Sequence, residues 1–216
     1  MEFGKEMKKQ RILKLPQLRF SGGISIEETL KSRRTIRSFS SKEIDLPVIS
    51  QLLWALQGVT YMEDLPEGEK IFHRAAPSAG RTYPLEVYVA LSTGLYRYEP
   101  REYTLHLISD EDVRNKLSEA AMTPLNKEAI KTAPLTIILA ADNKRALKAT
   151  PLFENAIRFV HLEAGHAAQN LILQAVSFGL GVCIITSYQV ATVYEVLKLP
   201  QEHRPIYILP IGFPKE

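Results

Sequence analysis

Residues 162–183, "LEAGHAAQNLILQAVSFGLGVC", carry the strongest structural pattern in the chain. The helical pattern runs from about Glu154 to Phe178, and its middle is apolar on nearly all sides and rich in Ala and Gly. Such a helix is expected to be buried, and its small residues let another helix approach closely. "GLG" at 179–181 indicates a helix end that leads into a strand, "VCIIT". The "GLG" segment is only weak evidence for a dinucleotide-binding loop, because the third glycine is missing and the segment follows a helix rather than a strand.

The segments around this helix predict further helices and strands. Ser25 and Glu28 form a capping-box pattern, which predicts a helix to about Arg34. A second helix is predicted to begin near Asp45 and to end at Gly58. The other predicted elements are, in chain order, a loop at 59–76, a strand at 85–91, a hairpin centred on 99–102, a helix at 109–122, a strand at 134–141, a helix at about 190–198 and a strand at 205–213.

Length and composition indicate one globular domain. The chain has 216 residues, of which 45% are apolar and 24% charged, and its formal net charge is only +3. Polar, basic residues 1–24 are expected to form an arm that packs on the body or frays, and residues 25–216 a single domain. The charge is too small for a dedicated nucleic-acid binder, and no apolar run is long enough to span a membrane. Without a secretory signal or a disulfide framework, we expect a cytoplasmic protein.

Three arginines lie within five positions in "RRTIRSFS", residues 33–40. Guanidinium groups hold phosphate through forked, charge-assisted hydrogen bonds. If the helix continued to Arg37, then Arg33 and Arg37 would share one face, with the hydroxyl of Thr35 between them. The segment is therefore either a binding site for a phosphate monoester or a solvated basic helix end, which the helix dipole favours. The motif alone leaves both interpretations open.

Two other features are interpreted as structural. His161, Glu163 and His166 suggest a metal site, but histidines five positions apart on a helix point about 140° away from each other. We therefore expect them to be core or interface histidines. Cys183, the only cysteine, is expected to be a small buried apolar residue.

Four motifs, in this order, resemble the nitroreductase-like FMN flavoproteins. They are "RRTIRSFS" at 33–40, "RAAPSAGRTYPLEVYV" at 74–89, the helix stretch at 162–183 and "PIGFP" at 210–214. The closest resemblance is to the branch with the dehydrogenases that oxidise thiazoline and oxazoline rings in modified peptides, and it covers roughly residues 25–214. It implies an α+β fold, a three-layer α-β-α sandwich with a central, mostly antiparallel sheet. It also implies an intertwined homodimer with one FMN per active site at the interface.

The resemblance implies three groups of FMN-binding residues and no catalytic side chain. The first group holds the phosphate and ribityl chain and consists of Arg33, Arg34, Thr35 and Arg37. The second passes over the isoalloxazine ring and consists of Pro77, Ser78, Ala79, Gly80 and Arg81, the last at a position where many nitroreductases have asparagine. The third reaches the dimethylbenzene or N5 side and consists of Ile184, Ile185, Thr186 and Ser187. In many members basic residues after the final "PIG" also clamp the phosphate, and here either Lys215 does so or the early arginines suffice.

The implied activity is transfer of hydride from NAD(P)H, through FMN, to nitro, quinone or similar small electrophilic compounds. Two alternatives stay open. One is a peptide azoline dehydrogenase, whose substrate gives up hydride and whose flavin is reoxidised by oxygen. The other is a flavin-binding protein with little turnover.

Overall fold

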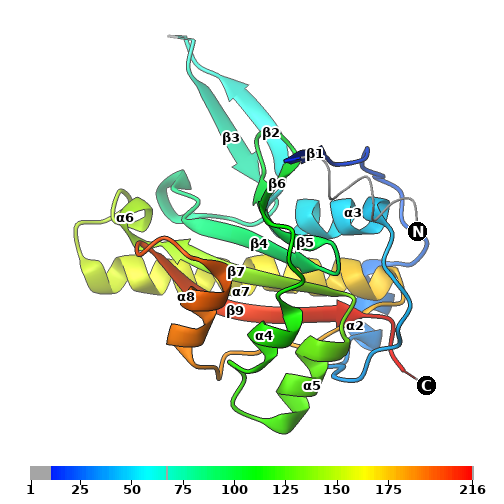
Figure 1. Ribbon diagram of the computed structural model, residues 1–216. Coiled ribbons are helices and arrows are strands. Elements are labelled where there is room, and N and C mark those ends of the chain that lie inside the picture. The colour runs from blue at the N-terminus through cyan, green and yellow to red at the C-terminus, as the bar shows by residue number, and fades with distance from the viewer. Residues whose placement is uncertain (1–10, 67, 216) are drawn as a thin grey trace.

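A computed structural model describes residues 11–66 and 68–215, and a seven-stranded sheet forms its middle layer (Figure 1). The strands are β1 (Ile12–Lys14), β4 (Leu85–Leu91), β5 (Gly94–Glu99), β6 (Thr104–Ser109), β7 (Leu135–Asp142), β8 (Gly181–Val182) and β9 (His203–Gly212). Their order across the sheet is β1-β6-β5-β4-β7-β9-β8. All of these neighbours pair antiparallel, as the sequence predicts for most of the sheet.

Helices cover both faces of the sheet. They are α2 (Ile26–Ser32), α3 (Leu46–Gln57), α4 (Arg114–Ser118), α5 (Pro124–Thr132), α6 (Asn143–Ala146), α7 (Phe153–Ser177) and α8 (Val190–Leu197), with one 3-10 turn at Ala79–Arg81. Alternate residues of β4 face opposite sides, so Val87 and Val89 pack with α3 and α7, whereas Tyr88 and Ala90 pack with α4 and α8. The protein is therefore the predicted α+β fold with an α-β-α layering (Figure 1).

Several predicted helix boundaries are confirmed by their caps. Ser25 precedes α2, and its hydroxyl accepts a hydrogen bond from the amide of Glu28. Asp45 and Gly58 bound α3, as predicted. Gly179 follows α7 with a φ of +70°, a left-handed conformation that glycine adopts without strain. The "GLG" segment is thus a helix end, as its position after a long helix indicates.

Helix α2, predicted to end at about Arg34, ends at Ser32 with Arg33 as its C-cap. It does not continue to Arg37, so Arg33 and Arg37 share no helical face. One sequence prediction is wrong. The segment 59–76, predicted as a loop, contains a hairpin of β2 (Val59–Asp64) and β3 (Lys70–Arg74) that projects from the body (Figure 1). Its one proline, Pro66, and its one glycine, Gly68, lie between the two strands.

Three further segments also differ from the prediction. The helix predicted at 109–122 is confined to α4, and α5, which Thr123 caps, is not foreseen. Of the strand "VCIIT", only Val182 belongs to β8, and Ile185 adds a single bridge to Ile208. Residues 12–14, within the predicted arm, pair with β6 as the edge strand β1. The described part of the chain has no helix that is both long and apolar enough to cross a membrane.

Helix α7 is not buried on all sides in the single chain. Its buried side contacts the sheet and α3. One stripe remains exposed at the helical spacing of three and four residues, and it consists of Arg158, His161, Leu162, Gly165, His166 and Gln169. The side chain of Leu162 is 53% exposed, which is unusual in the middle of a long, apolar helix.

Candidate functional site

The arginine segment is attached to the edge of the sheet by backbone contacts. Thr35 forms a parallel bridge with Val182, and the amide of Ile36 donates to the carbonyl of Val182 over 3.2 Å. Phe39 bridges Pro214, and the amide of Lys215 donates to the carbonyl of Ser38 over 3.0 Å. Two of the three predicted groups, residues 33–37 and 184–187, therefore lie side by side, and Lys215 joins them.

Gly181 lets this segment approach the sheet closely. A Cβ atom at position 181 would lie 2.5 Å from Cβ of Ile36, closer than nonbonded carbon atoms approach. The absence of a side chain at 181 thus permits the contact that positions residues 35–37.

We expect Gly181→Ala to displace the arginine segment and to lower the free energy of unfolding by about 1–3 kcal/mol, the usual cost of overpacking. Urea denaturation measures the change. Gly23→Ala is the matched control, since a Cβ at Gly23 meets nothing within 4 Å, and it should change stability by less than about 0.5 kcal/mol. Equal stabilities for the two variants would contradict this account of Gly181.

The arginines of the segment have different environments. The guanidinium of Arg34 donates to the carbonyls of Lys31 and Arg33, over 2.9 and 2.8 Å, and so caps the end of α2. The Nε of Arg37 donates to Oδ1 of Asn126 over 3.4 Å, and the half-buried Arg33 side chain forms no hydrogen bond with another described residue. Within residues 11–66 and 68–215, none of the cations Arg33, Arg37 and Lys215 forms an ion pair with an acidic side chain. This is a group of uncompensated positive charges, as an anion-binding site requires.

The segment after β8 lies next to these cations. Cys183 is fully buried, as predicted, and burial raises the pKa of its thiol, although the nearby guanidinium of Arg37 acts in the opposite direction. The four predicted residues that follow differ in exposure. Ile185 is buried, whereas Ile184, Thr186 and Ser187 are exposed and available to a ligand.

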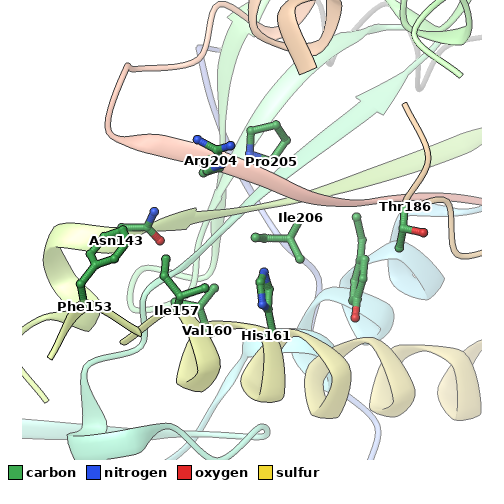
Figure 2. Close-up of a pocket in the computed structure, with 10 residues that line it drawn as sticks. Asn143, Phe153, Ile157, Val160, His161, Thr186, Arg204, Pro205 and Ile206 are labelled. Carbon is green, nitrogen blue, oxygen red and sulfur yellow. The ribbon is translucent and has the colours of Figure 1, made fainter. Parts of the chain in front are cut away.

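A cavity of about 620 Å³ extends from Thr186 between α7 and β9 (Figure 2). Its floor includes Ile157, Val160 and His161 of α7, and Ile206 of β9 lies opposite them. The lining is largely apolar with a few polar groups, which is typical of pockets that hold flat organic ligands.

The third predicted group, residues 77–81, forms a strained turn elsewhere. Gly80 has a φ of +58°, and Arg81 and Tyr83 have φ values of +56° and +45°, which non-glycine residues rarely adopt. The hydroxyl of Ser78 accepts a hydrogen bond from the amide of Tyr83 over 2.9 Å. Arg81 lies 4.0 Å from the carboxylate of Glu63 in the hairpin. Strain of this kind is often found at functional sites.

A buried polar cluster lies behind this turn and was not identified as a site from the sequence. Glu163 of α7 is 3% exposed, and its carboxylate accepts a hydrogen bond from the amide of Gln57 over 3.4 Å. Gln57 in turn accepts from Arg74 over 2.9 Å. Burial raises the pKa of Glu163 to about 7, while a hydrogen bond with Ser78 and the charge of Arg74 lower it. The sequence does contain a signal for this cluster: Glu163 is an acidic residue at a position that the helical repeat places among the buried, apolar residues of α7.

Glu163 is also one of the three residues, with His161 and His166, whose sequence pattern suggested a metal site. His161 and His166 are exposed, whereas Glu163 points to the opposite, buried side of α7. In the part of the chain that the structure describes, no three His, Cys, Asp or Glu side chains are grouped so as to hold a metal ion.

The turn at 77–81 and the arginine segment lie at opposite ends of the sheet. The turn precedes Leu85, which pairs with Ala141 near the end of β7, whereas Leu135 at the start of β7 pairs with Ile211, close to Lys215. Six residues of strand separate these positions by about 20 Å. No hydrogen bond or ion pair between described residues joins the two groups within one chain.

Comparisons with known proteins give a consistent result. The model of the Nitroreductase family matches residues 30–213. A relative from Methanocaldococcus jannaschii, named "Putative nitroreductase MJ1384", is 34% identical over 195 residues, which are 88% of this chain and 91% of that protein.

Solved structures show the same fold. A crystal structure named as a "putative nitroreductase" from Ralstonia eutropha has a TM-score of 0.79 and 30% identity, with 96% of this chain and 91% of that chain covered. An FMN-dependent nitroreductase from Clostridium difficile has a TM-score of 0.60 and 22% identity, with 87% of each chain covered.

Proposed function

Because the chain belongs to the nitroreductase family of flavin oxidoreductases, we propose that it binds FMN and transfers hydride from NAD(P)H to nitro, quinone or similar electrophilic compounds. The observation that carries the proposal is the group of cations Arg33, Arg37 and Lys215, which form no ion pair among the described residues. The segment 184–187 leads from this group to the largely apolar cavity, which Thr186 lines. FMN would supply the hydride chemistry when bound, and the chain's own residues would bind and orient it.

The phosphate is assigned to Arg33 and Arg37, with the hydroxyl of Thr35 and the ammonium of Lys215 beside them. The backbone bond from Lys215 to Ser38 favours a role for Lys215 in the phosphate clamp, because it holds the lysine next to the arginine segment. Arg34 is expected to contribute less to phosphate binding, since its guanidinium donates hydrogen bonds to carbonyls at the end of α2. Residues 184–187 are assigned to the ring system along the cavity.

A second copy of the chain is proposed to complete the site. The turn at 77–81 lies at the other end of the sheet from the arginine segment of its own chain, past about 20 Å of strand, so we propose that it reaches the ring of the partner's FMN. The exposed stripe of α7 offers a surface for the partner helix, and Gly165 at its centre has no side chain to keep a second helix away. The stripe supports an isologous dimer, in which the same surface is used by both subunits.

We expect Leu162→Arg to convert the dimer to a monomer at micromolar concentration, because it places a charge in the centre of the proposed interface. Light scattering measures the mass. Ile12→Arg is the matched control, since Ile12 is also 53% exposed but lies on the sheet edge β1. A dimer that survives Leu162→Arg would exclude α7 from the interface.

The activity is tested by the absorption spectrum of the purified protein. We expect the bands of oxidised FMN, their loss under anaerobic conditions when NADH or NADPH is added, and their return on addition of a nitroaromatic compound or a quinone. A colourless protein that takes up no FMN would refute the proposal. Bound FMN that no reduced nicotinamide bleaches, but that an azoline-containing peptide does, would indicate the peptide dehydrogenase instead. Bound FMN that neither reduces would indicate a flavin-binding protein with little turnover.

A further inference from the structure

The turn at 77–81 and the residues that follow it have an unfavourable backbone conformation. Gly80, Arg81 and Tyr83 all have positive φ values, between +45° and +58°, and only the first of them is a glycine. A backbone of this kind persists only where the surrounding contacts fix it. The contacts of Ser78 and Tyr83, on either side of Arg81, supply this constraint.

Two hydrogen bonds hold the turn. The hydroxyl of Ser78 accepts a hydrogen bond from the amide of Tyr83 over 2.9 Å, which closes the turn. The hydroxyl of Tyr83 accepts from the amide of Arg74 over 3.2 Å, and the guanidinium of Arg74 lies 4.8 Å from the centroid of the Tyr83 ring. The turn is thereby attached to the last residue of β3.

The same residues are connected to α3 and α7 by a closed series of hydrogen bonds. A side-chain nitrogen of Arg74 donates to Oε1 of Gln57 over 2.9 Å, and Nε2 of Gln57 donates to Oε1 of Glu163 over 3.4 Å. The carboxylate of Glu163 also accepts a hydrogen bond from Ser78, where the series began. These five residues form the polar circuit, which consists of Ser78, Tyr83, Arg74, Gln57 and Glu163.

Glu163 is the member of the polar circuit that accepts from both of its neighbours. The hydroxyl of Ser78 accepts from Tyr83, so its single proton can be directed to Glu163. The carbonyl of Gln57 accepts from Arg74, which leaves its amide protons for Glu163. Because Glu163 is only 3% exposed, water does not readily replace it as an acceptor. Loss of the carboxylate would therefore leave Ser78 free to rotate away from Tyr83.

We propose that Glu163 is a positioning residue, which acts through Ser78 to fix the turn at 77–81 in the conformation that meets the flavin ring. This role rests on the proposed function, in which the turn reaches the partner's FMN. Glu163 belongs to none of the three groups of predicted FMN-binding residues, so it would act on the flavin only through the turn.

Glu163→Met tests this role, because methionine keeps the length of the side chain and removes both oxygens. Hydrogen-exchange mass spectrometry of the purified protein follows the amide of Tyr83, the donor to Ser78. We expect this amide to exchange at least about tenfold faster than in the wild type. Titration of FMN should give a Kd at least about fivefold higher, because the turn no longer holds its conformation against the ring. Should Glu163→Met fail to fold, Glu163→Ala takes its place.

Glu163→Gln separates a positioning role from a simple loss of charge in the core. The amide oxygen of glutamine can accept from Gln57, and its NH₂ group can donate to the second lone pair of Ser78. The polar circuit would then stay closed. Both the exchange of the Tyr83 amide and the Kd for FMN should therefore remain within about twofold of the wild type.

Gln51→Leu is the matched control for the removal of a buried polar side chain. Gln51 is 6% exposed on α3, and it accepts from the amide of Arg19, outside the polar circuit. Its substitution should leave both the exchange of the Tyr83 amide and the Kd for FMN unchanged. The same two values for Gln51→Leu and Glu163→Met would overturn the inference.

A double-mutant cycle with Ser78→Ala tests whether Glu163 acts through Ser78. In the Ser78→Ala background, Glu163→Met should raise the Kd for FMN by less than about twofold further, because the connection is already broken. Additive effects would overturn the inference, as would unchanged exchange of the Tyr83 amide or an unchanged Kd in Glu163→Met. Those results leave the proposed function intact, whereas a wild-type protein that binds no FMN would refute the proposed function and this role together.

Discussion

Arg37→Glu should lower the affinity for FMN about 100-fold or more while leaving the fold intact. One charge-assisted hydrogen bond is worth about 1.5–3 kcal/mol, and the substitution also places a negative charge against the phosphate. The Arg37 side chain is exposed and its hydrogen bond to Asn126 is long at 3.4 Å, so the core loses little. Titration of FMN into the apo variant, followed by flavin fluorescence, measures the affinity, and circular dichroism checks the fold.

Lys14→Glu is the control for the change in net charge. Lys14 is exposed on β1, at the edge of the sheet opposite to the arginine segment, and its substitution should alter FMN affinity less than about twofold. If a folded Arg37→Glu protein bound FMN as tightly as the wild type, the arginine segment would be a solvated basic surface. A duplex DNA whose binding fell steeply with salt would point to nucleic acid instead.

Glu163→Gln should stabilise the protein above neutral pH. Because the pKa of Glu163 is raised to about 7 in the folded chain, the folded state holds a proton that the unfolded state releases near pH 4.5. The stability from this proton is complete below about pH 4.5 and is lost as the pH rises through 7. The free energy of unfolding should therefore fall by about 3 kcal/mol more in the wild type than in Glu163→Gln between pH 4.5 and 8.5.

Urea denaturation of the FMN-saturated protein at several pH values measures this difference. Glu154→Gln provides the comparison, because Glu154 is an exposed acid in the first turn of the same helix. In Glu154→Gln the free energy of unfolding should depend on pH as it does in the wild type. A Glu163→Gln protein with that same dependence would show that Glu163 is ionised in the folded state across the range, held by Arg74 and Ser78.

The sequence predicts the elements with strong periodicity or clear caps. The strand "LEVYVAL", the hairpin about Pro100, the helix α7 and the last strand all occur where expected. The hairpin β2–β3 was missed because "VTYMED" and "KIFHR" are short and flank a proline and a glycine, and its strands are paired mainly with each other. The strand β1 was missed because only three residues pair with β6. Tertiary contacts, which a single sequence does not display, decide such elements.

The candidate site was likewise predicted where its residues form local patterns and missed where it depends on tertiary contacts. The arginine motif and the turn at 77–81 are local patterns, and the sequence singled out both. Their separation within one chain depends on strand register, in which Leu85 pairs with Ala141 and Leu135 with Ile211, and no local pattern reveals it.

The backbone contacts of the arginine segment have a consequence for the order of events during protein synthesis. Thr35 and Phe39 lie early in the chain, but their partners, Val182 and Pro214, come from its last part. The segment therefore leaves the ribosome long before the residues that hold it exist, and it stays without its native contacts until the final strand has been made. Contacts so distant in sequence form slowly. Cofactor uptake should consequently be a late step that follows completion of the chain, and removal of residues 213–215 should release residues 38–40, while the Thr35–Val182 bridge keeps the start of the segment on the sheet.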